Sequence, residues 1–206
     1  MPPARYREQG EHADFRFGPA AEGAHKPVIV RHLPARQVVT LEHRGSYMHI
    51  GMAFDQLLGR LASKGLVRPG MRLLALFHDD PAAVRENDLR SHACVEGCLQ
   101  SPLEAPLALA VLAAGPHAVL THTGPYASMK AAYDWLFGHW LVRSGREPAD
   151  APVVEEYLNS PRETPPHDLR THICLPLKPM AGEEGEPAQP ADQAEAAGCS
   201  TRKPLK

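Results

Sequence analysis

The sequence predicts an α+β fold made of a duplicated strand-helix-strand-strand unit. The motif His-x-Gly-x-Tyr at residues 43–47 returns 79 positions later, at residues 122–126. Residues 88–94 return 80 positions later as residues 168–174, with five of the seven side chains identical. We interpret the extra position as a single-residue insertion in a loop. Two copies of one unit are expected to pack about a pseudo-two-fold axis and to leave a central ligand groove between them.

Apolar periodicity assigns the elements of each unit. In the first unit, branched apolar residues predict strands at 28–30, 38–41, 72–77 and 89–95. Between the second and third strands, Ser46 is an N-cap candidate, and it precedes a helical stripe of Ile50, Phe54, Leu57, Leu58 and Leu61. The second unit repeats this order, with strands at 107–112, 118–121, 153–158 and 169–177. Its helical stripe consists of Met129, Tyr133, Leu136, Phe137 and Trp140.

Composition divides the chain of 206 residues into three segments. Residues 1–26 are polar and lack periodicity, so they form a predicted N-terminal extension. Residues 27–178 form the predicted folded domain. Residues 179–206 are rich in Pro, Ala and Glu, and they are predicted to be a disordered tail because they carry too little apolar surface to offset the entropy of ordering.

Charge and hydropathy exclude several classes of protein. The net charge is −2 and the basic residues are scattered, so direct DNA binding by this chain is not expected. No apolar run is long enough for a membrane span, and the first residues lack the apolar core of a secretory signal. Four cysteines are too few and too irregularly spaced for a disulfide scaffold. A cytoplasmic protein with reduced thiols is therefore predicted.

The order of the motifs resembles the GyrI-like, or effector-binding, domain of bacterial regulators. The resemblance covers about 27–178 and rests on the two His-x-Gly-x-Tyr motifs, on Phe-His-Asp-Asp-Pro at 77–81, on Glu-Glu-Tyr-Leu-Asn at 155–159 and on Asp-Leu-Arg-Thr at 168–171. It implies a duplicated α+β fold with a small-molecule groove between the halves. Members of this family occur in AraC-type and MerR-type regulators and as gyrase-inhibitor-like proteins, and some are reported to hydrolyse cyclopropane-bearing genotoxins.

The N-terminal residues carry a second, shorter resemblance. Residues 3–7 are similar to the end of the second helix-turn-helix of AraC-type regulators, while the helix-turn-helix itself is absent from this sequence. A regulator that has lost its DNA-binding half and a gene model that begins too late both agree with this observation.

Glu155 is the first candidate for a functional side chain. Strand alternation places it on one face with Val153 and Tyr157, whereas the corresponding position in the first unit is Ala75. The resemblance implies that this glutamate lies at the floor of the groove. There it would attract a lipophilic cation, or act as a general acid or base if its pKa is raised. The alternative is an exposed Glu155 on an edge strand, with Glu156 pointing inward.

Aromatic residues are predicted to line the same groove. Tyr47 and Tyr126 precede the two helices at matching positions, and Phe77 and Tyr157 match in the strands. Together with Trp140 they would give a ligand flat apolar walls with a few polar tips. The alternative for each ring is ordinary core packing, and Trp140 lies on the core stripe of its helix.

The remaining histidines and cysteines are assigned structural roles. The matching positions of His43 and His122 favour a turn hydrogen bond. His92 with Cys94 and Cys98 does not have the closely paired spacing of a zinc site, so no metal and no cofactor are predicted. Cys94 has no placed base and is predicted to be an inert core thiol.

Three hypotheses for the function follow. The first is a cytoplasmic small-molecule-binding domain that senses or sequesters a lipophilic, drug-like compound and uses Glu155. The second, implied by the resemblance, is a hydrolase of strained electrophilic genotoxins in which Glu155 positions or activates water and Trp140 or Tyr157 shapes the site. The third is a protein-interaction module with gyrase or another protein as its partner.

Overall fold

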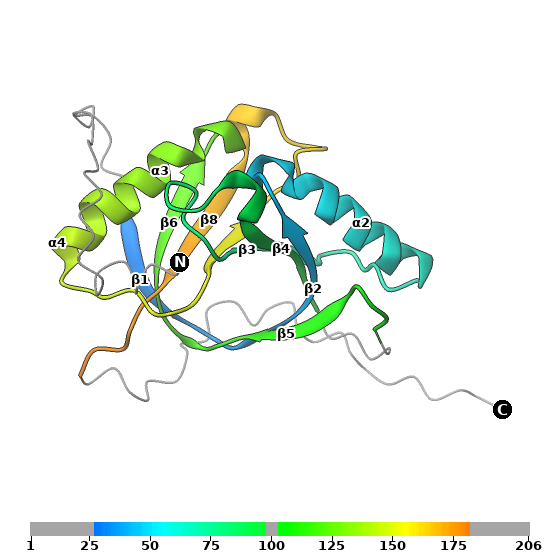
Figure 1. Cartoon of the computed structure of the whole chain (residues 1–206), viewed down its shortest axis with the longest axis horizontal. Helices are drawn as coiled ribbons and strands as arrows, with labels where there is room; N and C mark the ends of the chain where they lie inside the picture. Colours follow the sequence, from blue (N-terminus) through cyan, green and yellow to red (C-terminus); the bar gives the residue numbers. More distant parts are fainter. Residues whose placement is uncertain (1–26, 98–102, 182–206) are drawn as a thin grey trace.

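The computed structural model describes residues 27–97 and 103–181, which form an α+β fold. Figure 1 shows a curled, half-barrel sheet with the helices on its outer face. The predicted extension 1–26 and nearly all of the predicted tail 179–206 lie outside the described residues.

Two successive series of strands and helices build the chain. The first series is β1 (Val28–Leu33), β2 (Arg36–Arg44), α2 (Ile50–Ser63), β3 (Arg72–Phe77) and β4 (Arg90–Glu96). The second is β5 (Ala108–Leu112), β6 (Gly115–Thr123), α3 (Met129–Trp135), a π-helix (Leu136–Leu141) that continues into α4 (Val142–Ser144), β7 (Val153–Tyr157) and β8 (Arg170–Pro176). Each helix follows two strands, as the predicted strand positions imply, so each series has one strand more than the summary order strand-helix-strand-strand.

The eight strands form one antiparallel sheet in the order β1-β6-β8-β7-β3-β4-β2-β5. The order is mirrored about the centre of the sheet. The strands β1, β6, β8 and β7 on one side face β5, β2, β4 and β3 at the same distances from the opposite edge. At the centre, β3 pairs with β7 so that Ala75 is opposite Glu155. Leu73 pairs with Tyr157 and Phe77 with Val153, so the register is balanced about the Ala75–Glu155 pair.

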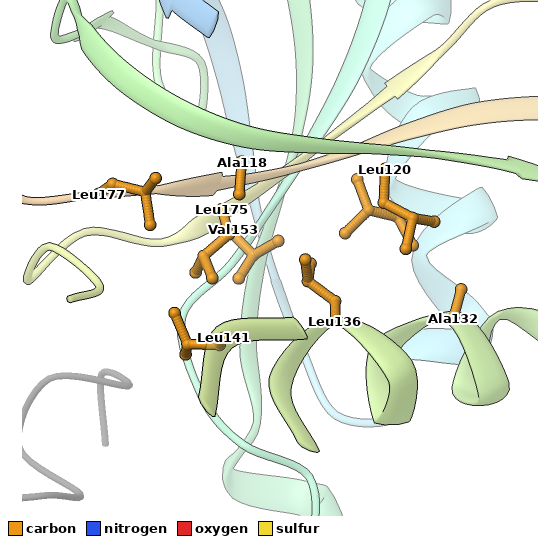
Figure 2. Packing of buried hydrophobic residues seen from close by; sticks show 9 residues of the cluster. Ala118, Leu120, Ala132, Leu136, Leu141, Val153, Leu175 and Leu177 are labelled. Atoms are coloured by element: carbon orange, nitrogen blue, oxygen red, sulfur yellow. The ribbon is translucent and has the colours of Figure 1, made fainter. Parts of the chain in front are cut away.

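Both faces of the sheet are covered by apolar packing. Beneath α3 lies a cluster that includes Leu120, Leu136, Val153 and Leu175 (Figure 2). A second cluster packs beneath α2. The opposite, concave face carries a third cluster: Val38, Leu74, Leu76, Cys94, Val119, Val154 and Cys174. Alternate residues of each central strand therefore enter different clusters, as the period of two in a strand requires.

The one-residue difference between the two series lies in the second helix, not in a loop. Gly45 and Gly124 both have positive φ and are 79 positions apart, whereas Gly65 and Gly145 have φ of 65° and 68° and are 80 apart. The offset therefore changes between residues 124 and 145. The π-helix Leu136–Leu141 lies in this interval, and a π turn accommodates one extra residue. The predicted loop insertion is wrong because the helix itself widens.

The π turn changes which side chain enters the core. The sequence predicts Trp140 as the counterpart of Leu61, which is fully buried on α2. In the structure, Leu141 is 7% exposed and occupies the core, while Trp140 is half-buried and packs against the edge of the cluster. Past the π turn, the core stripe is therefore displaced by one residue.

No helix within residues 27–97 and 103–181 is long and apolar enough to cross a membrane.

The π turn predicts a ranking of two neighbouring substitutions. Leu141→Ala should lower the free energy of unfolding by about 2–5 kcal/mol, because it leaves a cavity beneath the helix. Val142→Ala, at a position that is 67% exposed, should change it by less than about 0.5 kcal/mol. Urea denaturation monitored by circular dichroism measures both. Equal losses, or a larger loss for Val142→Ala, would contradict the displaced stripe.

Candidate functional site

Glu155 is a buried carboxyl group at the centre of the sheet. It lies on β7 between Ala75 of β3 and Ile173 of β8, and it is 5% exposed. Its side chain faces α3, on the side of the sheet that carries Val153. The alternative of an exposed glutamate on an edge strand is therefore wrong, since β7 has neighbours on both sides.

Two tyrosine hydroxyls bind this carboxylate, one to each oxygen. The hydroxyl of Tyr133 on α3 donates to Oε1 at 2.7 Å, and the hydroxyl of Tyr157 on β7 donates to Oε2 at 3.1 Å. Burial raises the pKa of Glu155 from 4.5 to about 7, and the two hydrogen bonds oppose the rise only in part. Near neutral pH the site therefore exchanges between a neutral acid and an anion.

Two further aromatic rings pack against Tyr157, which binds this carboxyl group. The Tyr157 ring contacts Phe54 of α2 edge-on at 5.6 Å between centroids, and it contacts Tyr126 edge-on at 5.5 Å. Tyr126 precedes α3, and burial, followed by the nearby charge of Glu155, raises the pKa of its hydroxyl. We call Glu155, Tyr133, Tyr157, Tyr126 and Phe54 the Glu155 cluster. Its four rings are half-buried, so each combines contact with the core and an accessible surface.

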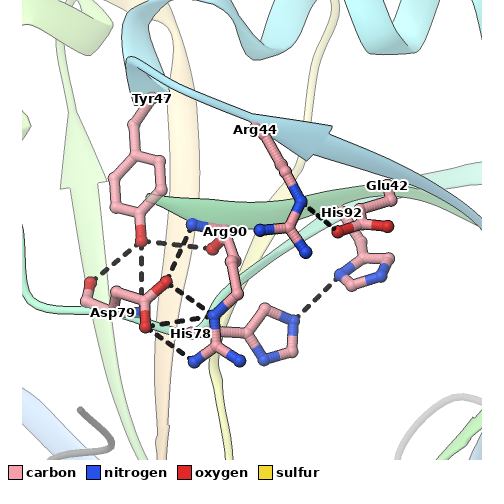
Figure 3. Close-up of polar contacts among 7 residues, drawn as sticks. All are labelled: Glu42, Arg44, Tyr47, His78, Asp79, Arg90 and His92. Carbon is pink, nitrogen blue, oxygen red and sulfur yellow. Dashed lines mark hydrogen bonds and ion pairs between the residues drawn. The ribbon is translucent and has the colours of Figure 1, made fainter. Parts of the chain in front are cut away.

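Tyr47 and Phe77 form a separate pair at the end of the sheet, with ring centroids 4.7 Å apart. The Tyr47 hydroxyl donates to the carbonyl oxygen of Asp79 at 2.9 Å and accepts from its backbone N–H at 3.1 Å (Figure 3). Asp79 also forms an ion pair with Arg90 at 2.7 Å. The hydroxyl of Tyr47 is therefore committed to holding this end of the sheet. For its counterpart Tyr126, the described part of the chain offers the hydroxyl no hydrogen-bond partner.

The two histidines of the repeated motif make hydrogen bonds of different kinds: the bond of His43 joins paired residues of β2 and β4, so the predicted turn bond is wrong there, whereas His122 bonds into the turn after β6. His43 Nδ1 lies 3.0 Å from the Ser91 hydroxyl, and His122 Nε2 lies 3.2 Å from the Ser128 hydroxyl. Cys94 is buried, and burial raises the pKa of its thiol to about 12, which suppresses the thiolate. Cys98 lies outside the described residues.

Tyr133 and Phe54 are the members of the Glu155 cluster that the sequence did not assign to the site. Both lie on apolar helical stripes, and the sequence analysis placed both in the core. One signal was present: Tyr133 carries a hydroxyl where the matching position of the first unit, Phe54, has none. A buried tyrosine hydroxyl requires a partner, and Glu155 is that partner.

The match to a family model covers most of the described chain. Residues 26–178 match the GyrI-like small molecule binding domain. The chain belongs to this family.

Solved structures share the fold of this GyrI-like domain. The C-terminal domain of EcmrR is 18% identical with a TM-score of 0.62, and the match covers 75% of this chain and 98% of that one. EcmrR in a complex with DNA gives the same identity and TM-score, but this chain spans 58% of that longer chain. An uncharacterized conserved protein from Listeria innocua is 12% identical with a TM-score of 0.56, and the match covers 76% and 94% of the two chains. At these identities the likeness concerns the fold.

The buried carboxyl group predicts a specific pH dependence of stability. Between pH 4.5 and about 7 the folded GyrI-like domain retains a proton on Glu155 that the unfolded chain has lost. Its contribution to stability is therefore greatest below pH 4.5 and falls by about 3 kcal/mol as the pH rises through 7. Glu155→Gln removes this dependence, so the variant should gain stability relative to the wild type from pH 5 to pH 8. Thermal melts across this range test it, and a constant difference between the two proteins would contradict it.

Proposed function

We propose that this GyrI-like domain binds a lipophilic, cationic small molecule at the Glu155 cluster, between α2 and α3. The observation that carries the proposal is a nearly fully buried carboxyl group whose two oxygens are held by Tyr133 and Tyr157. A buried glutamate without a basic partner is costly unless it is neutral or meets a cation. A ligand cation would supply the missing charge.

The rings around Glu155 suit the rest of such a ligand. Phe54 of α2, Tyr126 before α3, Tyr133 of α3 and Tyr157 of β7 offer aromatic faces and edges around it. A cation close to these faces gains a cation–π interaction in addition to its attraction to the carboxylate, and both interactions are stronger where water is excluded. Trp140 and the pair formed by Tyr47 and Phe77 would shape the outer limits of the site.

We also infer that the two series of elements are copies of one unit related by a pseudo-two-fold axis through the Ala75–Glu155 pair. The balanced register of β3 and β7 and the mirrored strand order support this inference. The ligand would then lie in a groove between the halves. The single carboxylate at the axis makes that groove asymmetric, because the other half has the methyl group of Ala75.

In the cell, this binding would serve to sense or sequester a drug-like compound in the cytoplasm. The net charge of −2 supports a role without direct DNA contact by this chain. Binding to gyrase or another protein is an alternative implied by the family resemblance, and a supercoiling assay with stoichiometric protein tests it.

The charge preference of the site gives the first prediction about ligands. Tetraphenylphosphonium should raise the melting temperature of the wild type, while the neutral triphenylphosphine oxide should raise it far less. Glu155→Gln should weaken the cation by about tenfold or more and leave the neutral compound unaffected. The matched control is Glu156→Gln on the opposite face, where Arg36 keeps its partner Glu96. If Glu155→Gln bound the two compounds with the same affinities as the wild type does, the proposal would be overturned.

The pKa of Glu155 adds a pH signature to the same experiment. A proton and a ligand cation compete for the carboxylate, so cation affinity should rise by up to about tenfold per pH unit until about pH 7 and then level off. Calorimetric titrations at pH 5.5, 6.5, 7.5 and 8.5 measure the profile. The Glu155→Gln variant should show no such profile.

One observation favours hydrolysis as a second candidate function. A carboxyl group with a pKa of about 7 is matched to proton transfer at neutral pH, so Glu155 could activate a water molecule. Mass spectrometry of a cyclopropane-bearing electrophile after incubation would then show the addition of one water, and Glu155→Gln would abolish it. Unchanged compound after prolonged incubation with the wild type would exclude hydrolysis of that compound.

A further inference from the structure

Two histidine side chains meet on the concave face of the sheet, opposite the helices. His92 lies on β4, two residues before Cys94, a member of the concave-face cluster. His78 directly follows β3, and its backbone N–H donates to the carbonyl oxygen of Arg90 at 3.2 Å, which continues the pairing of β3 with β4. The Nε2 atom of His78 lies 2.9 Å from the Nδ1 atom of His92 (Figure 3). Both rings are half-buried and half-accessible.

The carboxylate of Glu42 lies next to this pair of histidines. Glu42 on β2 is directly opposite His92 in the antiparallel register, so the two side chains lie on the same face as cross-strand neighbours (Figure 3). Glu42 forms an ion pair with Arg44 at 2.9 Å, but the side chains are 51% and 64% exposed. Exposed pairs contribute about 0–1 kcal/mol, so Glu42 can turn away from Arg44 at little cost.

The second half of the molecule lacks this arrangement. The positions that match His78 and Glu42 are Leu158 and Thr121, and only His92 has a histidine counterpart, His172. Symmetric packing therefore does not require the two imidazoles and the carboxylate. Like Glu155, they distinguish one half from the other.

We propose that His78, His92 and Glu42 bind a divalent transition-metal ion, with Zn²⁺ as the best match. In a tetrahedral zinc site, two ligating nitrogens at about 2.0–2.1 Å from the metal lie about 3.3 Å apart. The observed 2.9 Å separation is a hydrogen bond between these two nitrogens, so the spacing is close to that of two ligands. To bind the ion, the bridging proton leaves and the rings turn until both lone pairs face the metal. Rotation of Glu42 supplies an oxygen as the third ligand, and water occupies the fourth position at this accessible rim.

The electrostatics of the pair suit metal binding. A metal requires unprotonated imidazole nitrogens. Burial and the neighbouring histidine lower the pKa of His78, and burial is also the main cause that lowers the pKa of His92. Asp79 neutralises the nearby guanidinium of Arg90 through their ion pair. Within residues 27–97 and 103–181 no group of three such ligands is assembled in advance, so Glu42 completes the site when the ion enters.

The test is a zinc titration of the full-length, untagged protein after treatment with a chelator. Calorimetry gives the affinity, and long-range proton–nitrogen spectra of the imidazoles identify the histidines involved. Zn²⁺ should shift the His78 and His92 signals together at saturation. His78→Leu, which introduces the residue found in the other half, should weaken the site by at least about 100-fold, and Glu42→Thr by about tenfold.

His172→Gln is the matched control and should leave the affinity unchanged, because His172 has no second histidine at the position of Leu158. Glu155→Gln should also leave the zinc affinity unchanged, because Glu155 lies on the other face of the sheet. The zinc site and the proposed ligand site are therefore tested independently of each other. Circular dichroism of metal-free Glu42→Thr and His78→Leu verifies that both fold. Unshifted His78 and His92 signals, or wild-type affinity in folded His78→Leu, would overturn the proposal.

Discussion

The interaction on which the rest of the site depends is the binding of one buried carboxyl group by two tyrosine hydroxyls. Glu155 lies in the middle of an eight-stranded sheet, where an unpartnered charge would be costly. Its hydrogen bonds with Tyr133 and Tyr157 join α3 to β7 and orient both rings. They moderate the rise in its pKa without abolishing it, and this leaves a carboxyl group that can be either neutral or charged near pH 7.

The two faces of β7 keep this carboxyl group separate from the other charges of the sheet. Glu156, the next residue, points to the concave face and forms an ion pair with Arg36 at 3.1 Å. Arg36 also bonds Glu96 on β4, so this network links β2, β4 and β7. A one-residue slip of β7 would turn Glu156 to the helical face and would carry Glu155 and Tyr157 to the concave face, so the hydrogen-bonded group around Glu155 would be lost. The ion pairs on one face and the hydrogen bonds on the other therefore specify the same register.

Departures from the internal repeat mark the chemically distinct positions. The π-helix Leu136–Leu141 brings Leu141 into the core and moves Trp140 towards its edge. Tyr47 is fixed by Asp79, whereas the matching Tyr126 lies against Tyr157 of the Glu155 cluster. Tyr47 and Tyr126, which match in the repeated sequence motif, therefore have different surroundings in the structure.

The sequence by itself determined the α+β class, the positions of the strands, the stripe of the first helix and the first part of the second stripe, because periods of 2 and 3.6 residues are local properties of the chain. It also singled out Glu155 as a candidate, but the burial of that carboxyl group came from the tertiary structure. Only the tertiary structure decided that Tyr133 binds Glu155 and that His78 meets His92. It also placed the inserted residue in a helix, not in a loop. These outcomes depend on which strands become neighbours and on how a helix lies across them, and local periodicity contains no information about either.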